Sequence, residues 1–181
     1  ASSTHQGEEE ICLRIHQKLI KKFKNLILII IPRHTYRIND ITKNLLKYNM
    51  KFHMHSNKGP IQKDINVYLV DTYGETNIFF SICKNIFLGK SLTTDGGQNP
   101  LEPARQNCSI IHGPLVSNFT EIYSYLDKLK ISFKVNNEIQ LTNKLNMLIK
   151  KGKKTLKISS KINKIGDKVL KKNLNEIESF L

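Results

Sequence analysis

Hydrophobic residues occur along the chain either in short continuous runs or in stripes at helical spacing. The runs predict buried strands, because a stretch such as Leu26–Ile31 has no polar position that could face water. The stripes predict helices with one apolar face, as in residues 8–23, where three glutamates in the first turn complement the helix dipole. On this basis we predict strands at 26–31, 51–55, 67–70, 86–88, 110–111 and 132–135, and helices at 8–23, 37–48, 74–84, 100–107, 119–130, 138–151 and 155–181.

The predicted strands and helices alternate along the chain. Strands separated by helices of about 10 to 15 residues predict an α/β fold, in which a parallel sheet carries helices on both faces. In such folds ligands bind beyond the carboxyl ends of the strands, in the loops that lead to the next helix. We therefore expect the functional residues in five loops, which are 3–7, 32–36, 71–75, 89–102 and 113–119.

Composition and charge limit the classes of protein to which the chain can belong. Its 181 residues suffice for one domain, and its longest apolar run, of six residues, is too short to cross a bilayer. The net charge is +14, but the 25 Lys, 24 Ile and 18 Asn all have A/T-rich codons, so the lysine excess is weak evidence for a nucleic-acid partner. Half of this charge, +7, lies in residues 150–181.

The cysteines and histidines form no disulfide or zinc pattern. Cys12, Cys83 and Cys108 are odd in number and far apart, which argues against a disulfide framework and favours a reducing compartment. Cys12 and Cys83 fall on inward helix faces, so we expect both to be buried. His53 and His55 alternate on a strand with no third ligand nearby, and we expect both to be surface imidazoles. Nothing in the sequence requires a metal or another cofactor.

Three of the five loops carry side chains that suit a polar, anionic ligand. Arg33 can form two parallel hydrogen bonds to a phosphate, a carboxylate or a base carbonyl. Glu75 lies at a predicted helix start, where free N–H groups can meet an anion. The Gly96-Gly97 pair lets the backbone approach a ligand, and Glu102 is well placed to hold a ribose diol. The structural alternatives are an Arg33–carboxylate pair, a dipole role for Glu75, and a capping box of Asn99 with Glu102.

Five segments in these loops together resemble the 3-deoxy-D-manno-octulosonic acid (Kdo) transferase family, glycosyltransferases that move Kdo from CMP-Kdo to the lipid A precursor. One segment alone is a weak signal, but five in order at suitable spacing are specific, and the match extends over nearly the whole chain. The segments are Ser2–Glu9 (family pattern Ser-Thr-His-Glu-Gly-Glu), Pro32–His34 (Pro-Arg-His), Asp71–Glu75 (Asp-Thr-Met-Gly-Glu), Gly96–Ala104 (Gly-Gly-His-Asn-Pro-Leu-Glu-Pro-Ala) and Gly113–Phe119 (Gly-Pro-His…Asn-Phe).

The resemblance implies a GT-B architecture, in which two Rossmann-like domains enclose the active site. Residues 1–154 would be the Rossmann-like, CMP-sugar-binding C-terminal domain, and residues 155–181 a helical tail that packs toward the N-terminal domain. We expect Arg33 and helix starts at Gly74 and Pro100 to supply positive potential for the phosphate. Glu75 or Glu102 would accept hydrogen bonds from the ribose or the cytosine amine, and which does which is left open. By position, the family's CMP contacts fall on Pro32, Arg33, Tyr73, Gly74, Glu75, Asn99, Pro100, Leu101 and Glu102.

For the whole enzyme the resemblance implies inverting transfer, in which a base takes a proton from an acceptor hydroxyl that attacks the anomeric carbon as CMP leaves. In the family, the base and most of the site for the lipid A precursor belong to the N-terminal domain. We therefore expect this chain to bind the donor but to catalyse nothing alone. The whole protein would be peripheral or anchored at the cytoplasmic face of the bacterial inner membrane, with this part soluble. The lysines of the tail would then meet anionic lipid or form a solvated helix face.

The chain departs from the family pattern at five positions. Backbone contacts at position 73 should survive, whereas side-chain roles at 98 and 115 are in question. The departures are Gln6 for Glu, Thr35 for Pro, Tyr73 for Met, Gln98 for His and Leu115 for His.

Two other functions remain as alternatives. One is a GT-B glycosyltransferase that uses a UDP-sugar. The other is a basic Rossmann-like module that binds nucleic acid through its lysine-rich tail. We expect no nucleic-acid partner, because the loops contain no stripe of alternating aromatic and basic residues.

Overall fold

A seven-stranded sheet forms the centre of the structure, a computed structural model that describes residues 1–152. Every pair of neighbouring strands is parallel, and the strand order is β3-β4-β2-β1-β5-β6-β7. The central strand is therefore β1, and the connection from β4 to β5 crosses it. The strands are β1 (Ser2–Thr4), β2 (Leu28–Pro32), β3 (Phe52–Met54), β4 (Val67–Leu69), β5 (Asn85–Leu88), β6 (Ser109–His112) and β7 (Ser132–Lys134).

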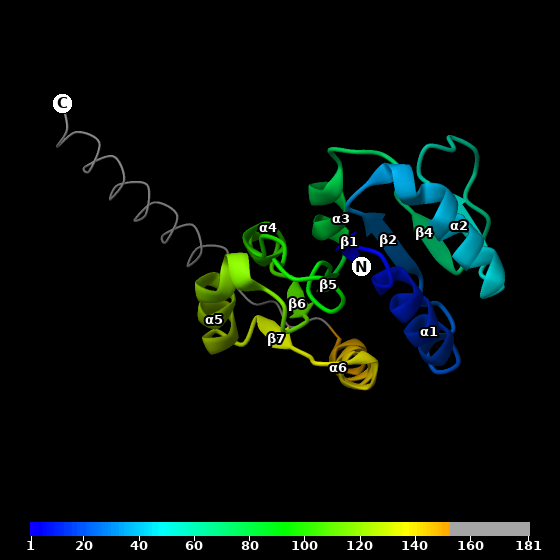
Figure 1. The fold of residues 1–181 in the computed structure, drawn as a ribbon. Helices are drawn as coiled ribbons and strands as arrows, with labels where there is room; N and C mark the ends of the chain where they lie inside the picture. The colour runs from blue at the N-terminus through cyan, green and yellow to red at the C-terminus, as the bar shows by residue number, and fades with distance from the viewer. Residues whose placement is uncertain (153–181) are drawn as a thin grey trace, which may run out of the picture.

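Helices cover both faces of the sheet (Figure 1). Successive side chains of a strand point to opposite faces, so in β5 Phe87 packs toward one helical layer while Ile86 and Leu88 pack toward the other. One layer consists of α1 (Glu8–Ile20), α2 (Ile38–Lys47) and α6 (Glu138–Lys151), and the other of α3 (Thr76–Ile82), α4 (Leu101–Arg105) and α5 (Thr120–Lys128). Turns of 3-10 helix, Thr35–Arg37 and Ser117–Phe119, precede α2 and α5.

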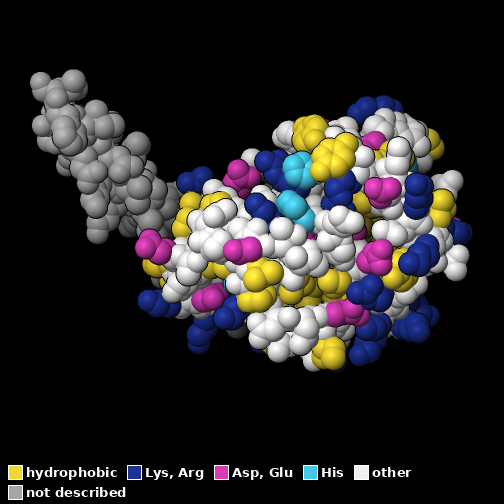
Figure 2. All heavy atoms as spheres, viewed as in Figure 1, with side chains coloured by type: hydrophobic (Ala, Val, Ile, Leu, Met, Phe, Trp, Pro, Cys, Tyr) yellow, Lys and Arg dark blue, Asp and Glu magenta, His cyan; other side chains and the backbone are white. Residues whose placement is uncertain are grey.

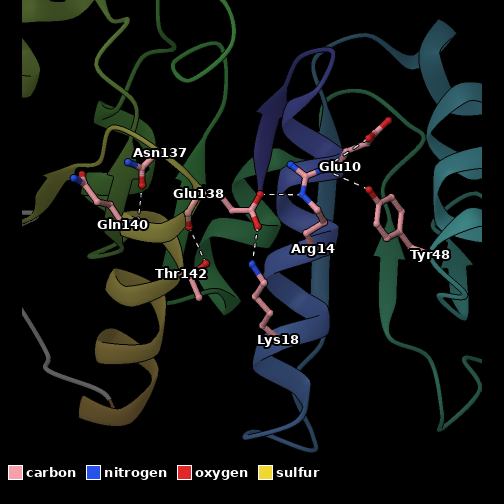
Figure 3. A network of polar contacts seen from close by, with 8 residues as sticks. All are labelled: Glu10, Arg14, Lys18, Tyr48, Asn137, Glu138, Gln140 and Thr142. Atoms are coloured by element: carbon pink, nitrogen blue, oxygen red, sulfur yellow. Dashed lines mark hydrogen bonds and ion pairs between the residues drawn. The ribbon is translucent and has the colours of Figure 1, made fainter.

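A polar network joins three helices of one layer (Figure 3). Glu138, the first residue of α6, accepts hydrogen bonds from Arg14 Nε at 2.9 Å and Lys18 Nζ at 2.8 Å. Arg14 also donates from Nη1 to the Tyr48 hydroxyl at 3.4 Å, just beyond α2. Asn137 caps α6 by accepting from the backbone N–H three residues on. These contacts fix α6 against α1, where both cover the centre of the sheet.

The predicted strands and helices within residues 1–152 are confirmed in type and order. The sequence predicts no strand at β1, because three small polar residues carry no hydrophobic pattern; Ser2 and Thr4 are nevertheless buried between the helical layers. The helices expected from Gly74 and Pro100 begin later, at Thr76 and Leu101, and are short. The predicted tail, 155–181, lies outside the described residues.

The expectation that His53 and His55 are surface imidazoles is wrong. His53 is 7% exposed, and its ring stacks on Tyr68. The side chain of His55 is 20% exposed and packs edge-on against the same tyrosine. Cys12 is buried as expected, and burial raises the pKa of its thiol to about 12, whereas Cys83 is only partly buried at the end of α3.

None of the helices within residues 1–152 combines the length and the apolar content needed to cross a bilayer.

Candidate functional site

The direction in which strands are added reverses between β1 and β5, where Ser2 pairs with Leu88. In open parallel sheets, loops that diverge at such a point border a crevice in which ligands bind. The five loops expected to carry function follow five adjacent strands, in the spatial order β4, β2, β1, β5 and β6. They therefore lie along one edge of the sheet, as predicted.

A buried carboxylate organises the centre of this edge. Glu8 is fully buried, and its two oxygens accept hydrogen bonds from four backbone N–H groups. One donor, His5 at 2.9 Å, belongs to the turn after β1; the others, Lys90, Ser91 and Leu92 at 2.8, 3.0 and 3.1 Å, belong to the loop after β5. The sequence predicts a helix-dipole role for this glutamate and includes it in the segment Ser2–Glu9 that resembles the family, but it does not predict these partners. The larger role of Glu8 is to tie two loops together across the point of reversal.

Two glycines let these loops approach each other closely. A Cβ atom at Gly89 would lie 2.4 Å from the Ser3 carbonyl oxygen, and one at Gly113 would lie 1.9 Å from the Ser91 carbonyl oxygen. Both distances are shorter than any that real Cβ atoms show. In the same region the Gly113 N–H donates to Ser91 Oγ at 2.9 Å. The loops after β5 and β6 are therefore locked by backbone packing.

A second buried acid connects the loop after β2 to the centre. Glu9 and Arg37 form a bidentate pair with distances of 2.8 and 2.9 Å, and the Glu9 side chain is 2% exposed. The N–H of Arg33 donates to the Thr4 carbonyl oxygen at 3.1 Å. No local pattern predicts this ion pair, because its partners are 28 residues apart.

The predicted residues after β2 and β4 form the exposed side of the edge. Pro32 is buried at the end of β2, whereas Arg33 is exposed and forms no salt bridge with any of residues 1–152. Tyr73 is 64% exposed, and its hydroxyl accepts from the Thr35 N–H at 3.1 Å, which lowers the pKa of the phenol. Gly74 has a φ of 90°, and a Cβ atom there would meet no atom of the described residues within 4 Å, so among them only backbone strain opposes a larger residue.

Glu75 is held by its neighbours instead of by the helix that it precedes. Its Oε2 atom accepts from the Thr72 hydroxyl at 2.7 Å and lies 2.8 Å from Nε2 of His55. The bond from Thr72 is the main cause that lowers the pKa of this carboxyl, and His55 adds to it. Glu75 is therefore ionised at neutral pH and can accept hydrogen bonds.

The predicted residues after β5 surround the start of α4. Asn99 Oδ1 accepts from the Leu101 N–H at 3.0 Å, Pro100 is buried, and Leu101 packs against the core. Glu102 is exposed, and within the described part of the chain its carboxylate has no hydrogen bond or ion pair. The capping box considered as an alternative is not formed, so Glu102 remains available to a ligand.

Positive charge at this edge comes from side chains. A Cβ at Gly96 would lie 2.9 Å from Lys90 Nζ, so this ammonium group rests against the glycine pair. The rings of His5 and His34 lie 5.6 Å apart, and burial is the main cause that lowers the pKa of His5. Figure 2 shows histidines beside Lys and Arg side chains on the face in view. The helix starts expected at Gly74 and Pro100 add little positive potential at this edge, because α3 and α4 have only seven and five residues.

This arrangement suits a ligand that combines an anion with hydroxyl or amine groups. Arg33 and Lys90 can meet a phosphate, while Glu75 and Glu102 can accept from a sugar or base. In residues 1–152 no group of three or more His, Cys, Asp or Glu side chains is arranged to hold a metal ion.

A cavity of about 250 Å³ lies at the opposite edge, where the strands begin. Its walls are mainly apolar and include Leu19, Phe79 and Phe80. They also include His16, whose pKa burial lowers to about 4. Such walls offer few partners to a charged ligand, so the carboxyl edge is the better candidate site.

Comparison with protein-family models finds no match. Among curated proteins, the chain is 36% identical over 137 residues to the 3-deoxy-D-manno-octulosonic acid transferase of Haemophilus influenzae, which covers 76% of this chain and 32% of that protein. It is 33% identical over 187 aligned residues to the enzyme of the same name from Rickettsia conorii, covering 99% of this chain and 40% of that protein. The chain thus spans less than half the length of these relatives.

A solved structure has the same fold over most of its length. It is the C-terminal CMP-Kdo binding domain of WaaA from Acinetobacter baumannii, with a TM-score of 0.81 and 25% identity. The match covers 91% of this chain and 86% of that one. The seven-stranded sheet described above is accordingly that of a GT-B C-terminal, Rossmann-like domain. The chain belongs to the 3-deoxy-D-manno-octulosonic acid transferase family and corresponds to its C-terminal domain.

Proposed function

We propose that this domain binds the CMP part of CMP-Kdo, as the donor domain of a Kdo transferase. The observation that carries the proposal is the convergence of the loops after β2, β4 and β5 on one edge, beside the reversal point of the sheet. These loops contain all nine residues that match the family's CMP contacts. The likeness to a solved CMP-Kdo binding domain supports the same donor.

The charges and hydrogen-bonding groups at the edge suggest a division of roles. Arg33 is exposed and unpaired among the described residues, so its guanidinium is available to the phosphate. Glu75 has one carboxylate oxygen engaged by Thr72 and His55, whereas neither oxygen of Glu102 has a partner within the described part of the chain. The cytidine hydroxyls and amine are donors that such oxygens accept. Tyr73 and Gly74 contribute backbone, and the segment from Asn99 to Leu101 shapes the approach to Glu102.

For the whole enzyme we propose inverting transfer of Kdo to the lipid A precursor. The acceptor site and the catalytic base would belong to another domain, so the 181-residue chain alone would bind CMP without catalysing transfer. Under the same proposal, the whole enzyme acts at the cytoplasmic face of the inner membrane, near anionic lipid. We also propose that residues 1–154 form the donor-binding domain and that residues 155–181 form a separate tail.

Calorimetric titration with CMP tests the donor assignment. We expect saturable binding that both Arg33→Ala and Glu102→Ala weaken about tenfold, because each removes a hydrogen bond to a charged group. Matched controls are Arg105→Ala at the far end of α4 and Glu121→Ala at the start of α5, which should bind CMP as the unmodified chain does.

Competition with other nucleotides separates this proposal from its alternative. We expect CMP to displace UMP and UDP. A preference for UDP would instead identify a UDP-sugar glycosyltransferase, and unchanged CMP affinity in both site variants would overturn the assignment of the site.

A further inference from the structure

The imidazole of His55 lies between two strands and the carboxylate of Glu75. His55 directly follows β3, and its backbone N–H donates to the Leu69 carbonyl oxygen at 2.8 Å. Its Nε2 lies 2.8 Å from Glu75 Oε2, and its Nδ1 lies 2.8 Å from the Tyr68 hydroxyl. One ring thus links the outer strands of the sheet to a proposed donor contact.

The position of this ring is restricted on several sides. It packs edge-on against Tyr68 and Phe79, with ring centroids 5.7 and 5.5 Å away. Both contacts are compatible with the neutral tautomer that carries its proton on Nε2. In that tautomer Nε2–H donates to the carboxylate, and Nδ1 accepts from the Tyr68 hydroxyl.

Both contacts on the Glu75 carboxylate fall on the same oxygen. Thr72 Oγ1 donates to Oε2 at 2.7 Å, and His55 approaches Oε2 as well. Among residues 1–152, Oε1 has no hydrogen bond or ion pair. Two donors on one oxygen fix the plane of the carboxylate and leave the other oxygen open, on a side chain that is 38% exposed.

We propose that His55 is a positioning residue for the donor site, which orients Glu75 so that Oε1 accepts a hydroxyl or amine of the bound nucleotide. The inference rests on the proposed function, because it assigns Glu75 to the nucleotide. His55 itself does not touch the ligand. Its effect on binding therefore passes through Glu75, and Tyr68 in turn orients His55.

A double-mutant cycle with CMP as the probe tests this coupling. We expect His55→Leu and Glu75→Gln each to weaken CMP binding about tenfold, because each removes the fixed charged acceptor. The double variant should bind no more than about threefold more weakly than Glu75→Gln alone, since His55 has nothing left to orient. His55→Gln keeps an N–H donor and should stay within about threefold of the unmodified chain.

The matched control is His16→Leu on α1, because His16 is a buried histidine at the opposite edge of the sheet, where it lines the apolar cavity. It should leave CMP affinity unchanged. An NMR titration of the Glu75 carboxyl without ligand gives an independent readout, and its pKa should rise in His55→Leu. If the unmodified chain binds CMP but the two losses multiply, or if His55→Leu binds normally, the inference fails while the proposed function stands. If the unmodified chain does not bind CMP, both fail.

Discussion

The central loops (residues 5–7, 89–92 and 113–116) and the outer loops (residues 32–36 and 71–75) border the same crevice but are held in different ways. In the central loops, one buried carboxylate accepts four backbone N–H groups, and glycines allow backbone to touch backbone. In the outer loops, apart from the backbone bond from the Arg33 N–H to the Thr4 carbonyl oxygen, exposed or half-buried side chains make the contacts, such as the Tyr73 hydroxyl with the Thr35 N–H and Thr72 with Glu75. The difference suggests that the central loops form a fixed floor, whereas the outer loops can adjust to the ligand.

The largest difference in stability should come from substituting two glycines, Gly113 in the central loops and Gly74 in the outer loops. Gly113→Ala places a Cβ against the Ser91 carbonyl oxygen, and we expect it to cost more than about 3 kcal/mol or to prevent folding. The Cβ of Gly74→Ala meets no atom of residues 1–152 within 4 Å, and the change should cost only the strain of its positive φ, about 1 kcal/mol. Thermal unfolding of both variants measures the difference. Equal losses would remove the distinction between the two regions.

A smaller difference in stability should separate two acids in the first turn of α1, Glu8 and Glu10. Glu8→Gln replaces an acceptor oxygen with an amide NH2 group that faces backbone donors, and we expect a loss of about 2 to 3 kcal/mol. Glu10→Gln breaks only a 3.8 Å contact with Arg14 at the surface and should cost under about 0.5 kcal/mol. Urea denaturation gives both values. If Glu8→Gln unfolds like Glu10→Gln, the buried carboxylate does not hold the loops.

The smallest effect should come from the exposed link between the outer loops. Tyr73→Phe removes the acceptor for the Thr35 N–H, and because both groups reach water we expect less than about 0.5 kcal/mol in stability. CMP affinity should fall about threefold, because the two loops are no longer joined. A loss of stability as large as that of Glu8→Gln would show that the outer loops are as rigid as the central ones.

The parts of this structure that could be predicted from sequence are those that carry a periodic pattern. The run Leu26–Ile31 and the stripe of α6 led directly to a strand and a helix, and motif resemblance located the outer loops. β1 has no such pattern, because its three residues are small and polar. They are buried by the two helical layers, and this burial depends on the whole fold and not on the local sequence. The side-chain partners also escaped prediction. Glu8 meets the loop after β5, far along the chain, and His55 reaches Glu75 from another strand.

The candidate site shows the same limit at single residues. The sequence predicts Arg33 and Glu102 as site residues from their charge and their loops, and both are exposed and unpaired among residues 1–152. The short helices α3 and α4 could not be foreseen, because Gly74 and Pro100 look like helix starts in sequence. A local sequence pattern cannot specify which residues, distant in the sequence, become the hydrogen-bond partners of each side chain.

Mapping of backbone amide shifts on the labelled chain during a CMP titration tests the central claim most directly. Saturable shifts should appear at Arg33, Glu75 and Glu102, at the carboxyl edge of the sheet. The amides of Ser91 and Leu92, held by Glu8, should move least among the loop residues. Shifts that cluster instead around the apolar cavity at the amino ends of the strands, or an absence of saturable shifts with CMP, would contradict the account.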